Sequence, residues 1–356
     1  ALSGEVITPG FSKVFAPDVI GPGSATRLVF TIDNGDIGTT VDSLAFTDTL
    51  PAGVSVADPA DVDNSCGGTV DAAVGGSTIS LANGRLGAFQ SCTISVYVTS
   101  ATPGEHLNVS GDLTSSRGNS GSASDTLTVT ESIPGFTKSF SPDTIPLGAT
   151  STLTIMIDNT SSGTPFSFEF DDLLPTGMHV AQVPNATTDC SGSLTAGPGT
   201  RQVQLFLGQV PAFDVCSVSV SVTTTDRGIF TNAVEITSDS GSVGYGVAEL
   251  DVPTTFLEKV FIDDPAAPGG TATLQFTITN LDRDQTATDI AFSDDLDVTL
   301  AGLTATLPPD PDPPCGAGSS LTGSSLLSFT GGTLAPQASC TFTVTLNVPA
   351  DAETGD

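Results

Sequence analysis

The sequence predicts an all-β protein made of tandem immunoglobulin-like β-sandwich domains. Residues 26–32 and 93–98 alternate apolar and polar side chains, as strands with one buried face do. Gly, Pro and Asn punctuate such segments at turn-like spacing, as at Asn34-Gly35, Pro51-Ala52-Gly53 and Asn83-Gly84. No helical periodicity of useful length occurs. Short strands separated by turns are typical of two packed antiparallel sheets.

An internal repeat sets the domain organisation. Pro9–Phe15 recurs as Pro134–Phe140 and, in weaker form, as Phe256–Phe261. A period of about 120 residues is too long for a solenoid, so each repeat is expected to be an independent domain. The predicted domains are residues 9–132, 133–253 and 254–356.

The two ends of the chain suggest further pieces of the same array. Residues 1–8 align with the end of the first repeat, which predicts the closing strand of a preceding domain or a donated strand. The third repeat lacks counterparts of residues 106–129, about two strands. Either the array continues beyond this segment, or a strand from another chain fills the gap. Self-association by strand donation, or continuation of a longer array, is therefore the expected partnership.

Charge narrows the range of partners. The chain carries 40 acidic residues against 9 Lys plus Arg, a formal net charge of -31. This field repels phosphate, so neither nucleic acid nor an anionic membrane surface is an expected partner. No stretch of 18 apolar residues occurs, so no membrane span is expected in this segment.

The six cysteines fall two to each repeat at nearly equal separations. The economical pairing is one disulfide within each domain. Metal ligation and redox catalysis are the alternatives, but there is no Cys-x-x-Cys pair, and His106 and His179 occupy unrelated positions in their repeats. Disulfides indicate an oxidising compartment, and hence an extracellular or cell-surface location. The predicted pairs are Cys66 with Cys92, Cys190 with Cys216, and Cys315 with Cys340.

Together these motifs resemble the DUF11-like repeat domains of bacterial and archaeal surface proteins. The resemblance covers essentially the whole chain, and implies an extracellular immunoglobulin-like sandwich used in surface arrays, adhesins and filaments. It implies no reaction. The third repeat departs from the pattern, because Phe292–Asp297 is not followed by a Pro-x-Gly turn. The residues that carry the resemblance in the first repeat are Lys13, Thr31–Asn34, Phe46–Gly53, Cys66, Cys92 and Asn108.

A lysine, an aspartate and an asparagine recur at matching positions in the first two repeats. In pilin-like sandwiches, a first-strand lysine attacks an asparagine carboxamide on a late strand and leaves an isopeptide crosslink. The reaction requires a desolvated, deprotonated lysine beside a carboxyl group. The alternative is a Lys-Asp ion pair with an Asn that satisfies backbone groups at a turn. The two triads are Lys13, Asp48 and Asn108, and Lys138, Asp172 and Asn232.

Rival asparagines occur at Asn34, Asn159 and Asn280, where the local sequence is more typical of turns. Acidic clusters also raise the hypothesis of calcium sites, because Ca²⁺ takes six to eight oxygen ligands. No EF-hand loop is present, and the alternative is that these acids are solvated turn residues. The calcium candidates are Asp33, Asp36, Asp282 and Asp284.

No catalytic constellation or phosphate-binding loop stands out, so the chain is not expected to be an enzyme or to need a cofactor other than calcium. The leading hypothesis is a structural extracellular protein, a disulfide-stabilised array that forms a surface stalk or a filament subunit. The alternative is an adhesin whose inter-strand loops bind glycan or protein on a host or cell surface.

Overall fold

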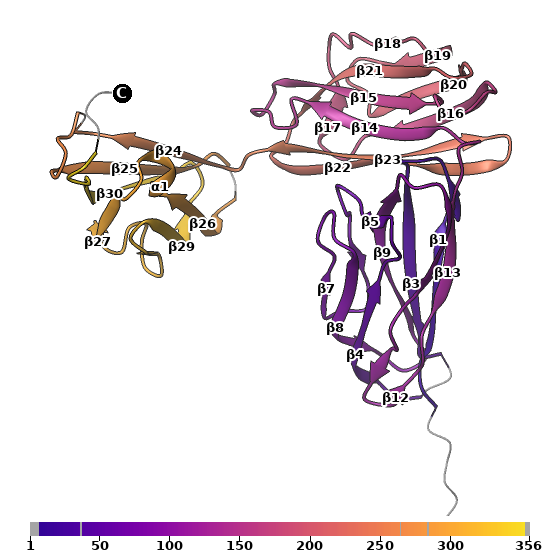
Figure 1. Cartoon of the computed structure of the whole chain (residues 1–356), viewed down its shortest axis with the longest axis horizontal. Coiled ribbons are helices and arrows are strands. Elements are labelled where there is room, and N and C mark those ends of the chain that lie inside the picture. The colour runs from indigo at the N-terminus through magenta and orange to yellow at the C-terminus, as the bar shows by residue number, and fades with distance from the viewer. Residues whose placement is uncertain (1–6, 36–37, 264, 283–284, 353–356) are drawn as a thin grey trace, which may run out of the picture. The chain divides into compact units, whose positions relative to one another are not determined.

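The structure is a computed structural model, and it describes residues 7–35, 38–263, 265–282 and 285–352. The chain folds into two compact units, Ala1–Val252 and Pro253–Asp356. The first unit contains two large hydrophobic cores, and the second contains one. Strands dominate the described residues (Figure 1). They include one short helix, α1 (Leu296–Thr299), and none with the length and apolar character needed to cross a membrane.

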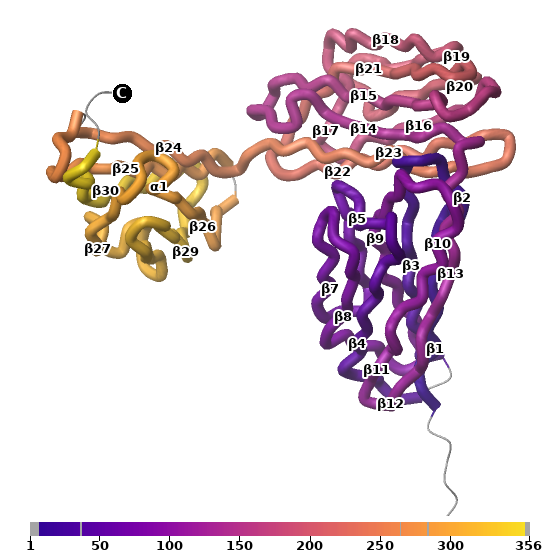
Figure 2. The backbone as a smooth tube through the Cα atoms, in the orientation of Figure 1, coloured from indigo at the N-terminus to yellow at the C-terminus, as the bar shows by residue number. Residues whose placement is uncertain are grey.

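The first domain is a β-sandwich around one core, and its sheets are antiparallel except that β2 pairs with β13 in parallel. Figure 2 shows the course of its strands. One sheet has the order β1-β3-β9-β5, with β6 also paired to β9; the others are β12-β11-β4-β8-β7 and β10-β13-β2. Burial alternates along β3, as the sequence pattern predicts. The strands are β1 (Gly10–Ala16), β2 (Val19–Ile20), β3 (Ala25–Asp33), β4 (Val41–Thr49), β5 (Val54–Val56), β6 (Asp63–Asn64), β7 (Thr69–Asp71), β8 (Thr78–Leu86), β9 (Ser91–Ser100), β10 (Gly104–Val109), β11 (Thr114–Ser115), β12 (Gly118–Asn119) and β13 (Ser124–Val129).

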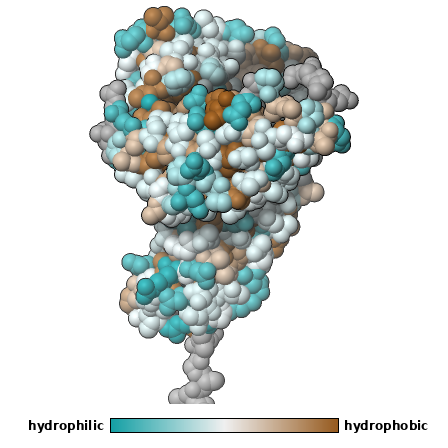
Figure 3. Space-filling view, turned by 90° about the vertical axis from the view of Figure 1, so that its left-hand side faces the viewer, coloured by the Kyte–Doolittle hydropathy of each residue, from teal (hydrophilic) through white to brown (hydrophobic). Residues whose placement is uncertain are grey.

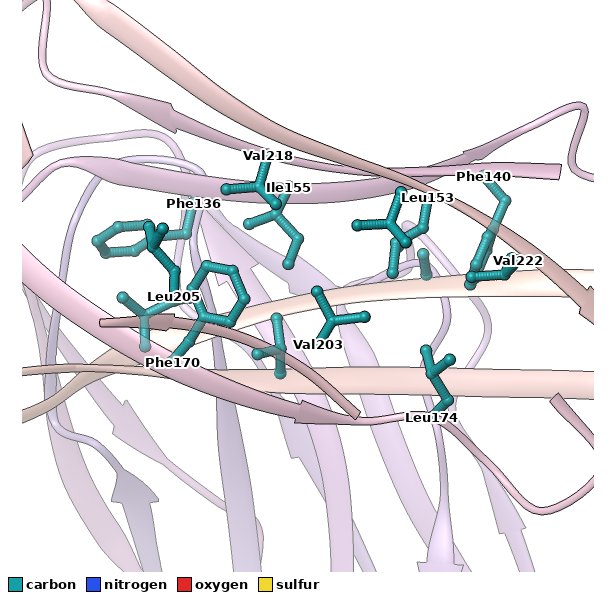
Figure 4. Packing of buried hydrophobic residues seen from close by; sticks show 14 of the residues in the cluster. Phe136, Phe140, Leu153, Ile155, Phe170, Leu174, Val203, Leu205, Val218 and Val222 are labelled. Atoms are coloured by element: carbon teal, nitrogen blue, oxygen red, sulfur yellow. The ribbon is translucent and has the colours of Figure 1, made fainter. Parts of the chain in front are cut away.

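The second domain repeats this plan. The sheet β14-β15-β21-β17, with β18 paired to β21, packs against β19-β20-β16-β22-β23. Figure 4 shows Phe136 and Ile155 pointing toward Phe170 and Leu205 between the sheets. The strands are β14 (Gly135–Ser141), β15 (Thr150–Asp158), β16 (Phe166–Leu173), β17 (Met178–Val180), β18 (Thr187–Thr188), β19 (Ser191–Ala196), β20 (Gln202–Val210), β21 (Val215–Thr224), β22 (Gly228–Ser238) and β23 (Gly241–Val252).

The third domain consists of the sheets β24-β25-β30-β27 and β26-β29-β28. Helix α1 follows β26, where the earlier repeats have a Pro-x-Gly turn. The Asp295 carboxylate caps this helix by accepting from the Asp297 N–H. Among the described residues of this domain, no strand corresponds to β10 or β13. The strands are β24 (Thr255–Phe261), β25 (Thr271–Asn280), β26 (Ala287–Asp295), β27 (Thr304–Asp310), β28 (Ser320–Thr322), β29 (Leu326–Leu334) and β30 (Ser339–Asn347).

One local expectation comes out differently, and another lies largely outside the described residues. Asn83-Gly84, read as a turn, lies inside β8, where the register with β4 shifts as at a β-bulge. Asn83 has φ 58°, and a Cβ on Gly84 would lie 3.1 Å from the side chains of Leu44 and Leu81. The strand expected over residues 1–8 lies largely outside the described residues. Ile7 and Thr8, which are described, belong to no strand.

Candidate functional site

The first domain brings Lys13, Asp48 and Asn108 together inside the sandwich. They come from β1, β4 and β10, far apart in the sequence. Lys13 Nζ donates to Asp48 Oδ1 at 2.9 Å, and Asn108 Nδ2 donates to Asp48 Oδ2 at 2.8 Å. The side chains of Lys13 and Asp48 are both 0 % exposed. The Asn108 carbonyl Oδ1 is buried and has no hydrogen-bond partner.

The second domain builds the same cluster from β14, β16 and β22. Lys138 Nζ donates to Asp172 Oδ2 at 2.7 Å and also to Asn232 Oδ1. Both charged side chains are fully buried. Here the Asn232 Nδ2 group and Asp172 Oδ1 are the buried atoms without a partner. Both domains therefore contain the cluster. In the first domain the asparagine joins it through the carboxamide nitrogen, and in the second through the carboxamide oxygen.

The placement of the lysine follows from strand alternation. In β1 the side chains of Phe11, Lys13 and Phe15 share the inward face, so the lysine takes a position that usually holds an apolar residue. Lys13 pairs in register with Phe30, and its amine lies 5.7 Å from the centroid of that ring. Lys138 pairs with Ile155 at the equivalent position.

Burial shifts the ionisation of Lys13, Lys138 and Asp172 toward the neutral forms. Loss of solvation lowers the pKa of the Lys13 amine, and the contacts with Asp48 oppose this only in part. Burial likewise lowers the pKa of Lys138 and raises the pKa of Asp172, against the attraction between their charges. In the second domain, a neutral amine beside a protonated carboxyl group is thus less costly than it is in water.

The third domain has only part of the cluster. Lys259 Nζ donates to Asp294 Oδ1 at 2.7 Å, and Lys259 keeps the strand register by pairing with Phe276. The two side chains are 30 % and 16 % exposed, so solvent reaches this pair. No hydrogen bond from either group to an asparagine occurs within the described residues. All three lysines of the chain therefore lie at one position of the first strand of a domain.

The rival asparagines serve a different purpose. Asn34 Nδ2 donates to the carbonyls of Thr39 and Gly87, and Asn159 Nδ2 to those of Thr164 and Pro211. Asn280 does the same in the third domain. Each buried carboxamide thus ties two loops together, as the turn interpretation expects.

Each domain holds one disulfide. Cys66 is bonded to Cys92, with the Cα atoms 5.1 Å apart. The other bonds join Cys190 to Cys216 and Cys315 to Cys340. The second cysteine of each pair lies on β9, β21 or β30, the strand that pairs with β3, β15 or β25.

The calcium candidates divide between described and undescribed residues. Asp36 and Asp284 lie outside the described residues. Asp33 Oδ1 accepts from the Gly35 N–H, and Asp282 Oδ1 accepts from the Gln285 N–H. Within the described part of the chain, no three His, Cys, Asp or Glu side chains gather as a metal site. Calcium binding at these positions stays a prediction.

Sequence reasoning missed a second polar cluster within the first unit. The Arg27 guanidinium lies 4.4 Å from the centroid of the Tyr97 ring and donates to Asp61 at 2.7 Å. Tyr97 contacts Tyr245 of β23, and Tyr245 pairs in register with Ala25 of β3. The first two domains are thereby joined through a small core of their own. Neither tyrosine belongs to a repeated motif, so the repeats gave no sign that the two residues form a pair.

Comparison with known structures finds similar sandwiches at low identity. The collagen adhesin of S. aureus has 12 % identity and a TM-score of 0.26, over 69 % of this chain and 93 % of that one. The C-terminal domain of the Streptococcus agalactiae AgI/II polypeptide BspA has 14 % identity and a TM-score of 0.24, over 68 % and 99 %. The Enterococcus faecalis protein ACE has 13 % identity and a TM-score of 0.26, over 68 % and 94 %. At these scores the likenesses carry no argument about function.

No curated protein matches the chain. A family model does match, at residues 9–129, 134–252 and 255–354, and these segments coincide with the three repeats. The matching family is not DUF11, so that resemblance stays a prediction. The chain belongs to the family described as a domain of unknown function, DUF7933, and carries three copies of it.

Proposed function

We propose that this chain is a structural segment of an extracellular or cell-surface protein, in which disulfide-stabilised β-sandwiches follow one another to form a stalk or a self-assembling filament subunit. The observation that carries the proposal is the disulfide at one equivalent place in each of three hydrophobic cores. Such bonds persist outside the cytosol, where thiol buffers do not reduce them.

The surface supports the same role. A net charge of -31 keeps copies of the chain soluble and suppresses non-specific association. The face shown in Figure 3 carries its apolar side chains in scattered patches among polar ones. Self-association in this proposal therefore proceeds through a defined joint, either strand donation or continuation of the array, and not through a broad apolar surface.

Adhesion is a second candidate, favoured by two exposed aromatic residues. Phe89 and Phe213 lie at equivalent turns, after β8 and after β20, and are 69 % and 70 % exposed. Both have a left-handed backbone, with φ 57° and 55°, which is unusual for a bulky residue. Exposed aromatic side chains are enriched at protein interfaces. If adhesion is the function, the Phe89→Ser, Phe213→Ser double variant should lose binding to an array of matrix proteins on which the wild type binds.

The proposal is tested on native, non-recombinant material. Thiol labelling under denaturing conditions, before and after reduction, should show six cysteines that react only after reduction. Denaturing electrophoresis and negative-stain imaging then distinguish the two assemblies. A continuous chain well above 35.8 kDa indicates a longer stalk, and 35.8 kDa subunits released from filaments indicate strand exchange. Cysteines that react without reduction would contradict an extracellular role.

A further inference from the structure

We propose that Lys13 and Asn108 in the first domain, and Lys138 and Asn232 in the second, are joined by isopeptide bonds that form spontaneously beside Asp48 and Asp172. Bond formation needs no enzyme or cofactor, and it does not depend on where the protein acts.

The reacting groups are held together in both domains. In the second domain, Lys138 Nζ contacts both the Asp172 carboxylate and the Asn232 carboxamide, so nucleophile, proton carrier and electrophile already touch. In the first domain, the Asp48 carboxylate holds Lys13 on one oxygen and Asn108 on the other. Fixing reactants in this way converts a bimolecular step into a unimolecular one and so lowers its barrier.

The ionisation state of the lysine decides whether it can react. An ammonium group is not nucleophilic, so the lysine must lose a proton before it can attack. The buried setting lowers the lysine pKa in both domains, and in the second domain it raises the pKa of Asp172, so transfer of a proton from amine to carboxylate costs less there than it does in water. The exposed pair Lys259 and Asp294 lacks this enclosure.

In the second domain, the unreacted cluster leaves a polar group unsatisfied. Asn232 Nδ2 is buried without a partner, and a buried donor left unpaired destabilises the folded state. Asn232 Nδ2 is also the atom that the reaction would expel. A simple ion pair with a supporting asparagine would leave this group unsatisfied, whereas its release as ammonia removes it.

The reaction balances with the groups present. The lysine ammonium first gives one proton to the aspartate. The neutral Nζ then attacks Cγ of the asparagine, forming a new C–N bond while the bond from Cγ to Nδ2 breaks. One Nζ proton passes to Nδ2, relayed by the carboxyl group, and Nδ2 leaves as ammonia. The aspartic acid remains protonated beside the new amide, and nothing is oxidised or reduced.

Mass spectrometry of the full chain tests the proposal directly. After complete reduction, the intact mass should fall below the sequence mass by about 34 Da, two molecules of ammonia. Trypsin should release residues 1–27 joined to 86–117, and residues 118–201 joined to 228–259, because crosslinked lysines are not cleaved. This wild-type measurement is informative even if every variant fails to fold.

Replacing one aspartate at a time tests whether each crosslink depends on its own carboxyl group. Asp172→Asn should abolish the second joined pair of peptides and keep the first, and Asp48→Asn should do the reverse. The matched control is Asp294→Asn in the third domain, which should keep both pairs. A reduced intact mass equal to the sequence mass would overturn the proposal. So would a mass deficit without joined peptides, since cyclisation at Asn34-Gly35 or Asn83-Gly84 also releases ammonia.

Discussion

The ring of Tyr97 lies against the ring of Tyr245, with centroids 5.4 Å apart and planes inclined at 58°. Tyr97 belongs to β9 of the first domain and Tyr245 to β23 of the second. They are the two tyrosines of a chain that has no tryptophan. Tyrosine absorbance and fluorescence therefore report on the contact between these domains, and on no other part of the molecule.

The first prediction concerns alkaline pH. Burial, followed by the charge of Glu235, raises the pKa of Tyr245 to about 12, and burial also raises the pKa of Tyr97. Both groups have ordinary values near 10.0. Above pH 10 the folded state retains tyrosine protons that the unfolded state has released. The free energy of unfolding should therefore fall as pH rises from 10 toward 12. In a pH titration, the tyrosinate absorbance of the folded protein should therefore rise at a higher pH than that of the urea-unfolded chain. Superposable titration curves would contradict the prediction.

The second prediction concerns the strength of this contact. Tyr245→Ala removes an aromatic pair that contributes about 1 kcal/mol beyond its buried area. Cleavage of the 130–134 connection by a non-specific protease should then become about fivefold faster, while each domain core persists. Tyr245→Phe keeps the ring and is the matched control. Equal cleavage rates for the alanine variant and the wild type would show that the rings do not hold the domains together.

The third prediction concerns a loop anchor. Asn159→Ala deletes the carboxamide that donates to the carbonyls of Thr164 and Pro211 at 2.8 Å each. Unpaired carbonyls in this setting should lower the free energy of unfolding of the second domain by about 1–3 kcal/mol. Differential scanning calorimetry should show this as a lower Tm for one transition. The exposed strand residue Gln209 provides a control, because Gln209→Ala should change stability by about 0.5 kcal/mol or less.

The fourth prediction concerns the disulfides. Replacing Cys66 and Cys92 together by alanine opens a loop with a sequence separation of 26 residues. Loop-closure entropy then predicts a loss of about 3.5 kcal/mol from the first domain. Calorimetry should show one transition moving to lower temperature while the others stay in place. The matched control is the same double replacement of Cys190 and Cys216, which should move a different transition.

The sequence was sufficient for the sandwich fold and for the buried triads, because both depend on repetition. Strand alternation places Lys13 on an inward face, and the recurrence of Asp48 and Asn108 as Asp172 and Asn232 marks them as one group. The inner faces of the two sheets of a sandwich always pack against each other. Inward-facing residues at matching positions of the repeats are therefore expected to lie close together.

Features that depend on a single position could not be predicted in this way. The bulge at Asn83 has the residue types of a turn, and only the pairing of β8 with β4 on both sides of it shows that the strand continues. Contact between Tyr97 and Tyr245 depends on how one domain meets the next, which no periodicity within a domain records. The exposure of Lys259 and Asp294 likewise depends on which strands cover them, although their sequence positions match those of the buried pairs.

The strand positions of the lysines and asparagines have a mechanical consequence. Lys13 lies on the first strand of its domain and Asn108 on β10, and Lys138 and Asn232 repeat this arrangement on β14 and β22. Tension applied to the two ends of the chain would pass through each new amide and bypass every residue between its partners. Between the two bonds, only the backbone from Asn108 to Lys138 could then be drawn out, to about 100 Å when fully extended. These two domains would resist a pulling force through covalent bonds, and not through the hydrogen bonds of their sheets.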